Sequence, residues 1–109
     1  MPWLDLVAYC FGGAFLSNAI PHLVRGVTGQ SFQTPFARPR GSGQSSSTVN
    51  VLWGFCNIVV SYLLVYQVGS FDARNTADAG AFGLGLLAMS LGSACIFGRY
   101  HGGNRPEQP

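Results

Sequence analysis

The sequence predicts an all-α membrane protein with three transmembrane helices, and two observations carry this prediction. Charged residues make up only 9% of the 109-residue chain, against about 25% in a typical soluble domain. Three apolar runs lie at 4–24, 49–68 and 79–97. Each is about 20 residues long, which at 1.5 Å per residue spans a hydrocarbon core of about 30 Å. We therefore expect residues 1–109 to form a single membrane domain, a three-span helical bundle.

The first run ends on the stretch SNAIPHLVRG, which places an amide, a proline and an imidazole near one membrane boundary. Pro21 has no backbone N–H, so the helix is expected to kink or to end there. We expect Ser17 and Asn18 to provide partners for the freed backbone groups, and Gly26 to cap the helix in a left-handed conformation. Because Asp5 lies near the start and no arginine or lysine precedes it, we expect a retained span rather than a cleaved signal peptide.

A loop at 25–48 follows the first span, and its density of glycine, proline and serine argues against a helix. Its second half, GSGQSSS, is expected to be flexible. Its first half places Phe32 and Phe36 close to Arg38 and Arg40. That combination suits contact with an anionic lipid surface or a lid over the bundle, and a plain loop is the remaining alternative.

The distribution of arginine predicts the orientation in the membrane. Five arginines lie in the first loop and the polar tail at 98–109, whereas the opposite side carries only Arg74 together with three aspartates. Because arginine-rich flanks stay in the cytoplasm, we expect the N-terminus outside and the C-terminus in the cytoplasm of a bacterial inner membrane. The five arginines are Arg25, Arg38, Arg40, Arg99 and Arg105.

Polar residues of the three spans fall at matching depths on the side of the first loop. At 1.5 Å per residue, Asn18, Asn57 and Ser90 share one level, and His22 and Asn50 share a level nearer the surface. We expect these side chains to converge in the bundle interior. One interpretation is a set of interhelical hydrogen bonds that hold the helices together, and the other is a small polar vestibule for a solute or a proton.

Helical spacing assigns these residues to particular faces. Asn18 and His22 are four residues apart and share a face of the first span. In the second span the spacing i, i+4, i+7, i+11 places one set on a single face: Asn50, Gly54, Asn57 and Ser61.

The third span carries a stripe of small residues, of which we take Gly85, Ala88 and Gly92 as helix-packing positions because small residues let helix backbones approach. The stripe can pack within the protomer, against a second copy or against another subunit. Three helices bury little surface alone, so besides the lipid bilayer we expect a homo-oligomer or a larger membrane complex.

The sequence offers no recognisable catalytic or metal-binding pattern. Its three cysteines, Cys10, Cys56 and Cys95, fall one in each span without metal-ligand spacing, and it has no paired carboxylates. We therefore predict no enzyme activity, no metal and no cofactor. A cofactor or lipid held through His22 is the least favoured alternative. The net charge of +2, without a basic patch carrying interleaved aromatics, excludes nucleic acid as a partner.

Several residues in and around the first loop resemble a group of small bacterial inner-membrane proteins that has no assigned activity. The resemblance covers about the middle third of the chain. It implies a bacterial membrane protein in which the loop and its flanking helix ends form one unit. The residues that carry it are Pro21, His22, Gly26, Gly29, Phe32, Thr34, Pro35, Phe36 and Pro39, followed by NVLWGFCN from Asn50 to Asn57.

Besides binding through His22, the sequence leaves two functions open. The first is an accessory or scaffold subunit that packs against other membrane helices through its small-residue faces. The alternative is a homo-oligomeric channel or small-solute transporter whose path is lined by the polar residues at these matching depths.

Overall fold

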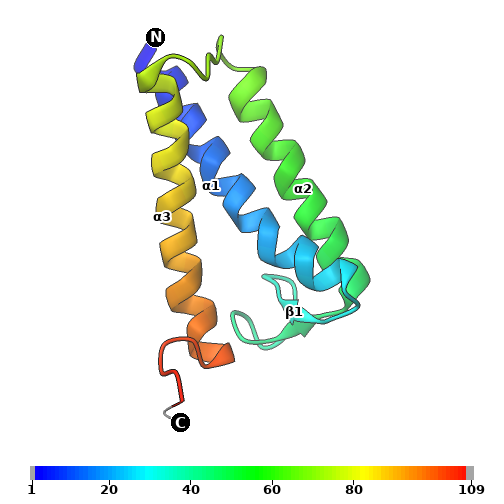
Figure 1. The fold of residues 1–109 in the computed structure, drawn as a ribbon. Helices are drawn as coiled ribbons and strands as arrows, with labels where there is room; N and C mark the ends of the chain where they lie inside the picture. The colour runs from blue at the N-terminus through cyan, green and yellow to red at the C-terminus, as the bar shows by residue number, and fades with distance from the viewer. Residues whose placement is uncertain (1, 108–109) are drawn as a thin grey trace.

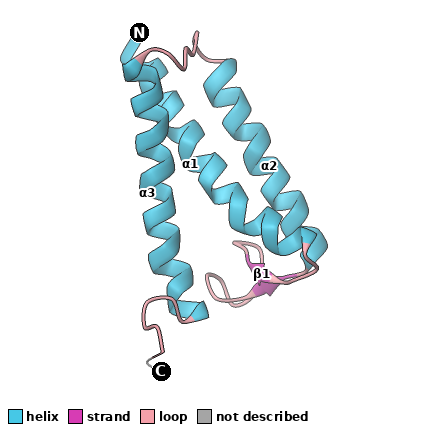
Figure 2. Cartoon of the chain, viewed as in Figure 1, coloured by secondary structure: helices cyan, strands magenta, loops and turns pink. Residues whose placement is uncertain are grey.

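The computed structural model describes residues 2–107 and contains three long helices, with a small hairpin in the connection between the first two (Figures 1 and 2). All three helices are long and apolar enough to cross a membrane, so the all-α class is confirmed. The elements are α1 (Pro2–Val27), β1 (Phe32–Gln33), β2 (Gln44–Ser45), α2 (Ser47–Tyr66) and α3 (Thr76–His101).

The helix bounds differ from the apolar runs because capping residues extend the helices beyond them. The Ser46 side chain accepts a hydrogen bond from the Val49 N–H, so α2 begins at Ser47, two residues before the run. The Asn75 side chain likewise accepts a hydrogen bond from the Asp78 N–H, so α3 includes a polar first turn. At its other end α3 reaches His101, where Gly102 has the left-handed φ of 82° that terminates helices.

The end of α1 decides between two expectations about the SNAIPHLVRG stretch and corrects a third. Pro21 does not end the helix, which continues to Val27, and its cyan end bends towards α2 in Figure 1. Gly26 is not the cap, because it lies inside the helix. The cap is Gly29, with a φ of 75°, and the Gln30 N–H donates to the Arg25 carbonyl at 2.9 Å. The last carbonyls of α1 therefore accept hydrogen bonds from backbone N–H groups that lie farther along the chain than the predicted end of the helix.

The connection between α1 and α2 folds into an antiparallel hairpin, which was not predicted. Phe32 pairs with Ser45 and Gln33 pairs with Gln44. The Ser31 hydroxyl also donates to the Gln44 side-chain oxygen at 2.7 Å. The hairpin thus includes part of the segment that the sequence describes as flexible. We call the end of the molecule that carries β1 and β2 the hairpin end.

Helix α1 lies between α2 and α3 and packs against both, whereas α2 and α3 diverge from one another towards the hairpin end (Figure 1). Glycines allow the close contacts. A Cβ atom on Gly54 of α2 would lie 2.9 Å from the Leu23 nitrogen of α1, and one on Gly85 of α3 would collide with the Cys10 carbonyl of α1. These two contacts fix the distance of each outer helix from the central one.

We expect the substitution Gly85→Ala to lower the free energy of unfolding by about 1–3 kcal/mol, because the added methyl group forces α3 away from α1. The matched control is Gly80→Ala, since a Cβ atom at Gly80 has no neighbour within 4 Å. Unfolding of the purified protein by sodium dodecyl sulfate in mixed micelles measures both. Equal stability of the two variants would contradict the close packing at Gly85.

Candidate functional site

The polar residues predicted at matching depths form hydrogen-bonded pairs between helices at the hairpin end. The Asn18 side-chain nitrogen donates to the Asn57 Oδ1 at 3.0 Å, and the His22 Nδ1 lies 2.8 Å from the Asn50 Oδ1. Ser90 of α3 does not join either pair. Its hydroxyl lies 2.7 Å from the hydroxyl of Ser17. Ser17 was expected to hydrogen-bond the backbone groups that Pro21 leaves free, and it pairs with Ser90 instead. We call these six side chains the polar layer.

Asn50 is the most enclosed member of the polar layer, with an exposed fraction of 0%. Its side-chain nitrogen lies 3.2, 3.1 and 3.0 Å from the backbone oxygens of Phe32, Ser45 and Ser46, respectively. The side-chain oxygen is therefore the atom that faces His22. A carbonyl oxygen only accepts, so Nδ1 of His22 carries the hydrogen. In the neutral imidazole the Nε2 atom is then an acceptor.

Aromatic rings surround the His22 imidazole. Its centroid lies 5.5 Å from that of Phe32, 6.4 Å from that of Trp53 and 6.3 Å from that of Phe97, all at steep interplanar angles. These rings come from β1, α2 and α3. His22 of α1 is thus the point at which all three helices and the hairpin meet.

The hairpin is also fastened to the end of α3. The ring of His101 stacks on Phe32 at 5.2 Å and 7°, and its Nε2 lies 2.9 Å from the Gln33 Oε1. Gln33 itself is 5% exposed. The hairpin therefore bridges the diverging ends of α2 and α3.

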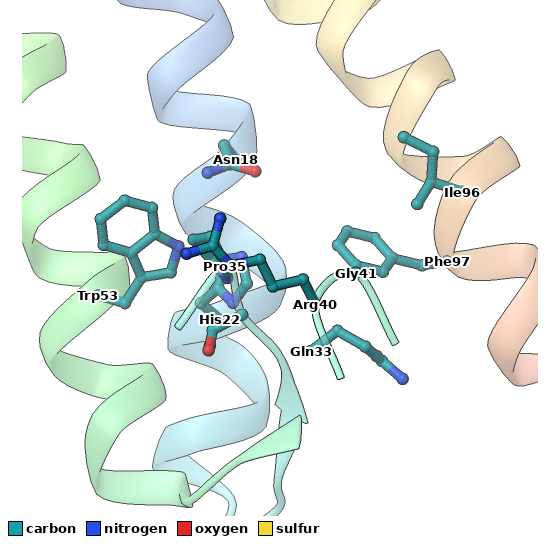
Figure 3. A pocket seen from close by; sticks show the side chains of 10 residues that line it. Asn18, His22, Gln33, Pro35, Arg40, Gly41, Trp53, Ile96 and Phe97 are labelled. Atoms are coloured by element: carbon teal, nitrogen blue, oxygen red, sulfur yellow. The ribbon is translucent and has the colours of Figure 1, made fainter. Parts of the chain in front are cut away.

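A cavity of about 420 Å³ lies beside this junction, between the hairpin, α2 and α3 (Figure 3). Trp53 lines it, and the buried Nε1 of its indole is the one buried side-chain nitrogen or oxygen without a hydrogen-bond partner in residues 2–107. Figure 3 places the guanidinium of Arg40 in front of this indole edge. The lining residues are Asn18, His22, Gln33, Thr34, Pro35, Arg40, Gly41, Trp53, Ile96 and Phe97.

The predicted packing positions of α3 divide into two groups. Gly85 is buried against α1, whereas Ala88 and Gly92 are exposed. On α2, by contrast, the predicted face is the buried one, comprising Asn50, Gly54, Asn57 and Ser61.

Three contributors to this region were missed by sequence reasoning. Gln33 and Thr34 gave no signal because polar residues in a Gly/Pro/Ser-rich loop are usually exposed. Trp53 gave no signal because tryptophan is common near membrane interfaces. Within the described part of the chain, no group of three or more His, Cys, Asp or Glu residues is placed to hold a metal ion.

Comparisons with protein families, with curated proteins and with solved structures find no match to this chain.

We expect Asn50→Ala to be more destabilising than Asn57→Ala. Asn50 connects α1, α2 and the hairpin, and its loss leaves buried polar groups unpaired at about 1–3 kcal/mol. Asn57 makes one interhelical bond, worth about 0.6 kcal/mol in membrane proteins.

Denaturation by sodium dodecyl sulfate measures both effects, and limited trypsin cleavage after Arg40 reports release of the hairpin. Faster cleavage is expected for Asn50→Ala alone. Equal cleavage rates in the two variants would show that Asn50 does not hold the hairpin.

Proposed function

We propose that the protein is an accessory subunit of a larger membrane assembly and docks through α3. The observation that carries this proposal is the surface of α3, where Gly85 is the one buried residue among the 26 that the structure describes in this helix. A helix so weakly covered by its own chain has most of its surface available to lipid or to another protein.

The composition of α3 favours a protein partner along one face. Gly85, Ala88 and Gly92 follow one another at helical spacing, and Gly85 already permits close contact with α1. Gly92 has no neighbour within 4 Å of an added Cβ atom, so no contact within the chain accounts for it. A small residue at this position suits the close approach of a helix from another chain.

The pairing within the polar layer supports an accessory role over a channel. Asn18 is bonded to Asn57, and His22 is bonded to Asn50, so these groups satisfy one another across α1 and α2. Polar groups used in this way hold helices together and offer few free donors or acceptors to a passing solute. A homo-oligomeric channel or transporter remains the alternative.

We further propose a bacterial inner membrane as the location, with the hairpin end in the cytoplasm. The five arginines near the hairpin end, against Arg74 at the other, support this orientation. The resemblance around the hairpin to bacterial inner-membrane proteins supports the compartment.

We expect Gly92→Leu to reduce recovery of the partner about tenfold, because the larger side chain prevents close helix packing at a cost of about 1–3 kcal/mol. Gly83→Leu is the matched control. Nine residues make about two and a half helical turns, so Gly83 lies on the opposite face of α3. It also has open space within the chain.

Native mass spectrometry of the tagged protein, extracted gently from its own membrane, measures recovery. A heteromer that Gly92→Leu disrupts and Gly83→Leu preserves is the expected result. A defined homo-oligomer without other subunits would favour the channel or transporter instead.

The orientation is tested by cysteine labelling in a background without the three native cysteines. We expect Gln30→Cys, at the hairpin end, to resist a membrane-impermeant thiol reagent in intact cells, and Ser70→Cys, at the other end, to react. Both positions are exposed in the structure. The reverse pattern of labelling would place the hairpin outside the cytoplasm.

A further inference from the structure

The cavity beside the hairpin contains a buried donor that needs an acceptor. The Trp53 Nε1 is enclosed and has no partner in the part of the chain that the structure describes. Nearly all buried N–H groups in proteins are hydrogen-bonded, and an indole N–H can only donate. An occupant of this cavity would therefore present an oxygen acceptor to Trp53.

The charge around the cavity makes that acceptor an anion. Arg40 lines the cavity and carries a planar cation with five N–H donors, a geometry that matches the oxygens of a phosphate. The acidic residues lie elsewhere: Asp5, Asp72 and Asp78 are at the opposite end of the helices, and Glu107 is in the exposed tail. Arg40 and Trp53 thus offer donors without a neighbouring carboxylate that would compete for them.

The remaining walls of the cavity favour an amphiphile over a small polar anion. Ile96 and Phe97 of α3 and Pro35 of the hairpin are apolar and face the same space as Trp53 (Figure 3). The cavity lies between α2 and α3, which diverge at this end (Figure 1). Both helices carry exposed apolar side chains, and an adjoining apolar groove shares Ile96 and Phe97 with the cavity.

We propose that this cavity binds one anionic phospholipid, with its phosphate on Arg40 and Trp53 and its acyl chains along α2 and α3. Basic pockets between membrane helices recognise lipid headgroups in this way. Gly92 does not line this cavity, and Arg40 and Trp53 lie outside α3, so variants of Arg40 and Trp53 test lipid binding without altering the docking face of α3.

Native mass spectrometry of the intact protein in non-ionic detergent tests the proposal with three probes: dioctanoyl phosphatidylglycerol, dioctanoyl phosphatidylcholine and inorganic phosphate. We expect one phosphatidylglycerol to bind about tenfold more tightly than phosphatidylcholine. Both lipids carry the phosphate, but the choline ammonium of phosphatidylcholine cancels its charge and is repelled by Arg40. Inorganic phosphate should bind more weakly than phosphatidylglycerol, since it lacks the acyl chains.

The matched variants are Arg40→Gln and Arg38→Gln, which remove equal charge from the same exposed loop, although only Arg40 lines the cavity. Arg40→Gln should weaken phosphatidylglycerol binding about tenfold, and Arg38→Gln should leave it nearly unchanged. Trp53→Phe, which keeps an aromatic ring but removes the N–H, should also weaken binding. Helix content by circular dichroism checks that each variant is folded.

Three results would overturn the proposal. Equal binding of the two phospholipids would show that the cavity does not select a lipid with a net negative headgroup. Equal losses in Arg40→Gln and Arg38→Gln would indicate general electrostatic attraction rather than this cavity. Inorganic phosphate binding as tightly as phosphatidylglycerol would identify a site for free phosphate and exclude the lipid.

Discussion

The hydrogen bonds of Asn50 are the interaction on which the hairpin end depends. One amide group joins the start of α2, both strands of the hairpin and, through His22, the central helix. In surroundings with little water, an amide left without partners is expensive, so these bonds favour one arrangement over looser ones. The same bonds orient the His22 ring and fix which of its nitrogens carries the hydrogen. The aromatic rings around it then exclude other packings.

The sequence was sufficient for the parts of the fold that depend on length, apolar character and helical spacing. The three helices follow from their apolar runs, and the buried face of α2 follows from the spacing of Asn50, Asn57 and Ser61. The pairing of Asn18 with Asn57 and of His22 with Asn50 follows from counting residues inward from a common boundary. Length, apolar character and spacing depend on residues close together in the sequence. The regular geometry of a helix then extends their consequences along its whole length.

The features that sequence reasoning missed depend on contacts between distant segments. The hairpin strands are only two residues long and are held by side chains from α2 and α3. Composition alone therefore describes the segment as a loop. Gly26 is not the cap of α1, because Gly29, farther along the chain, adopts the left-handed conformation that ends the helix. The cavity could not be foreseen either, since its walls come from four separate elements.

The distances along the chain between hydrogen-bonded partners have a consequence for biosynthesis. The ribosome produces α1 first, with Ser17, Asn18 and His22 on it. Their partners follow 73, 39 and 28 residues later, respectively. When the first helix is inserted it therefore carries polar side chains whose interhelical partners have not yet been synthesised. The pairing order is set by translation: His22 finds its partner first, Asn18 next, and Ser17 only when the last helix arrives.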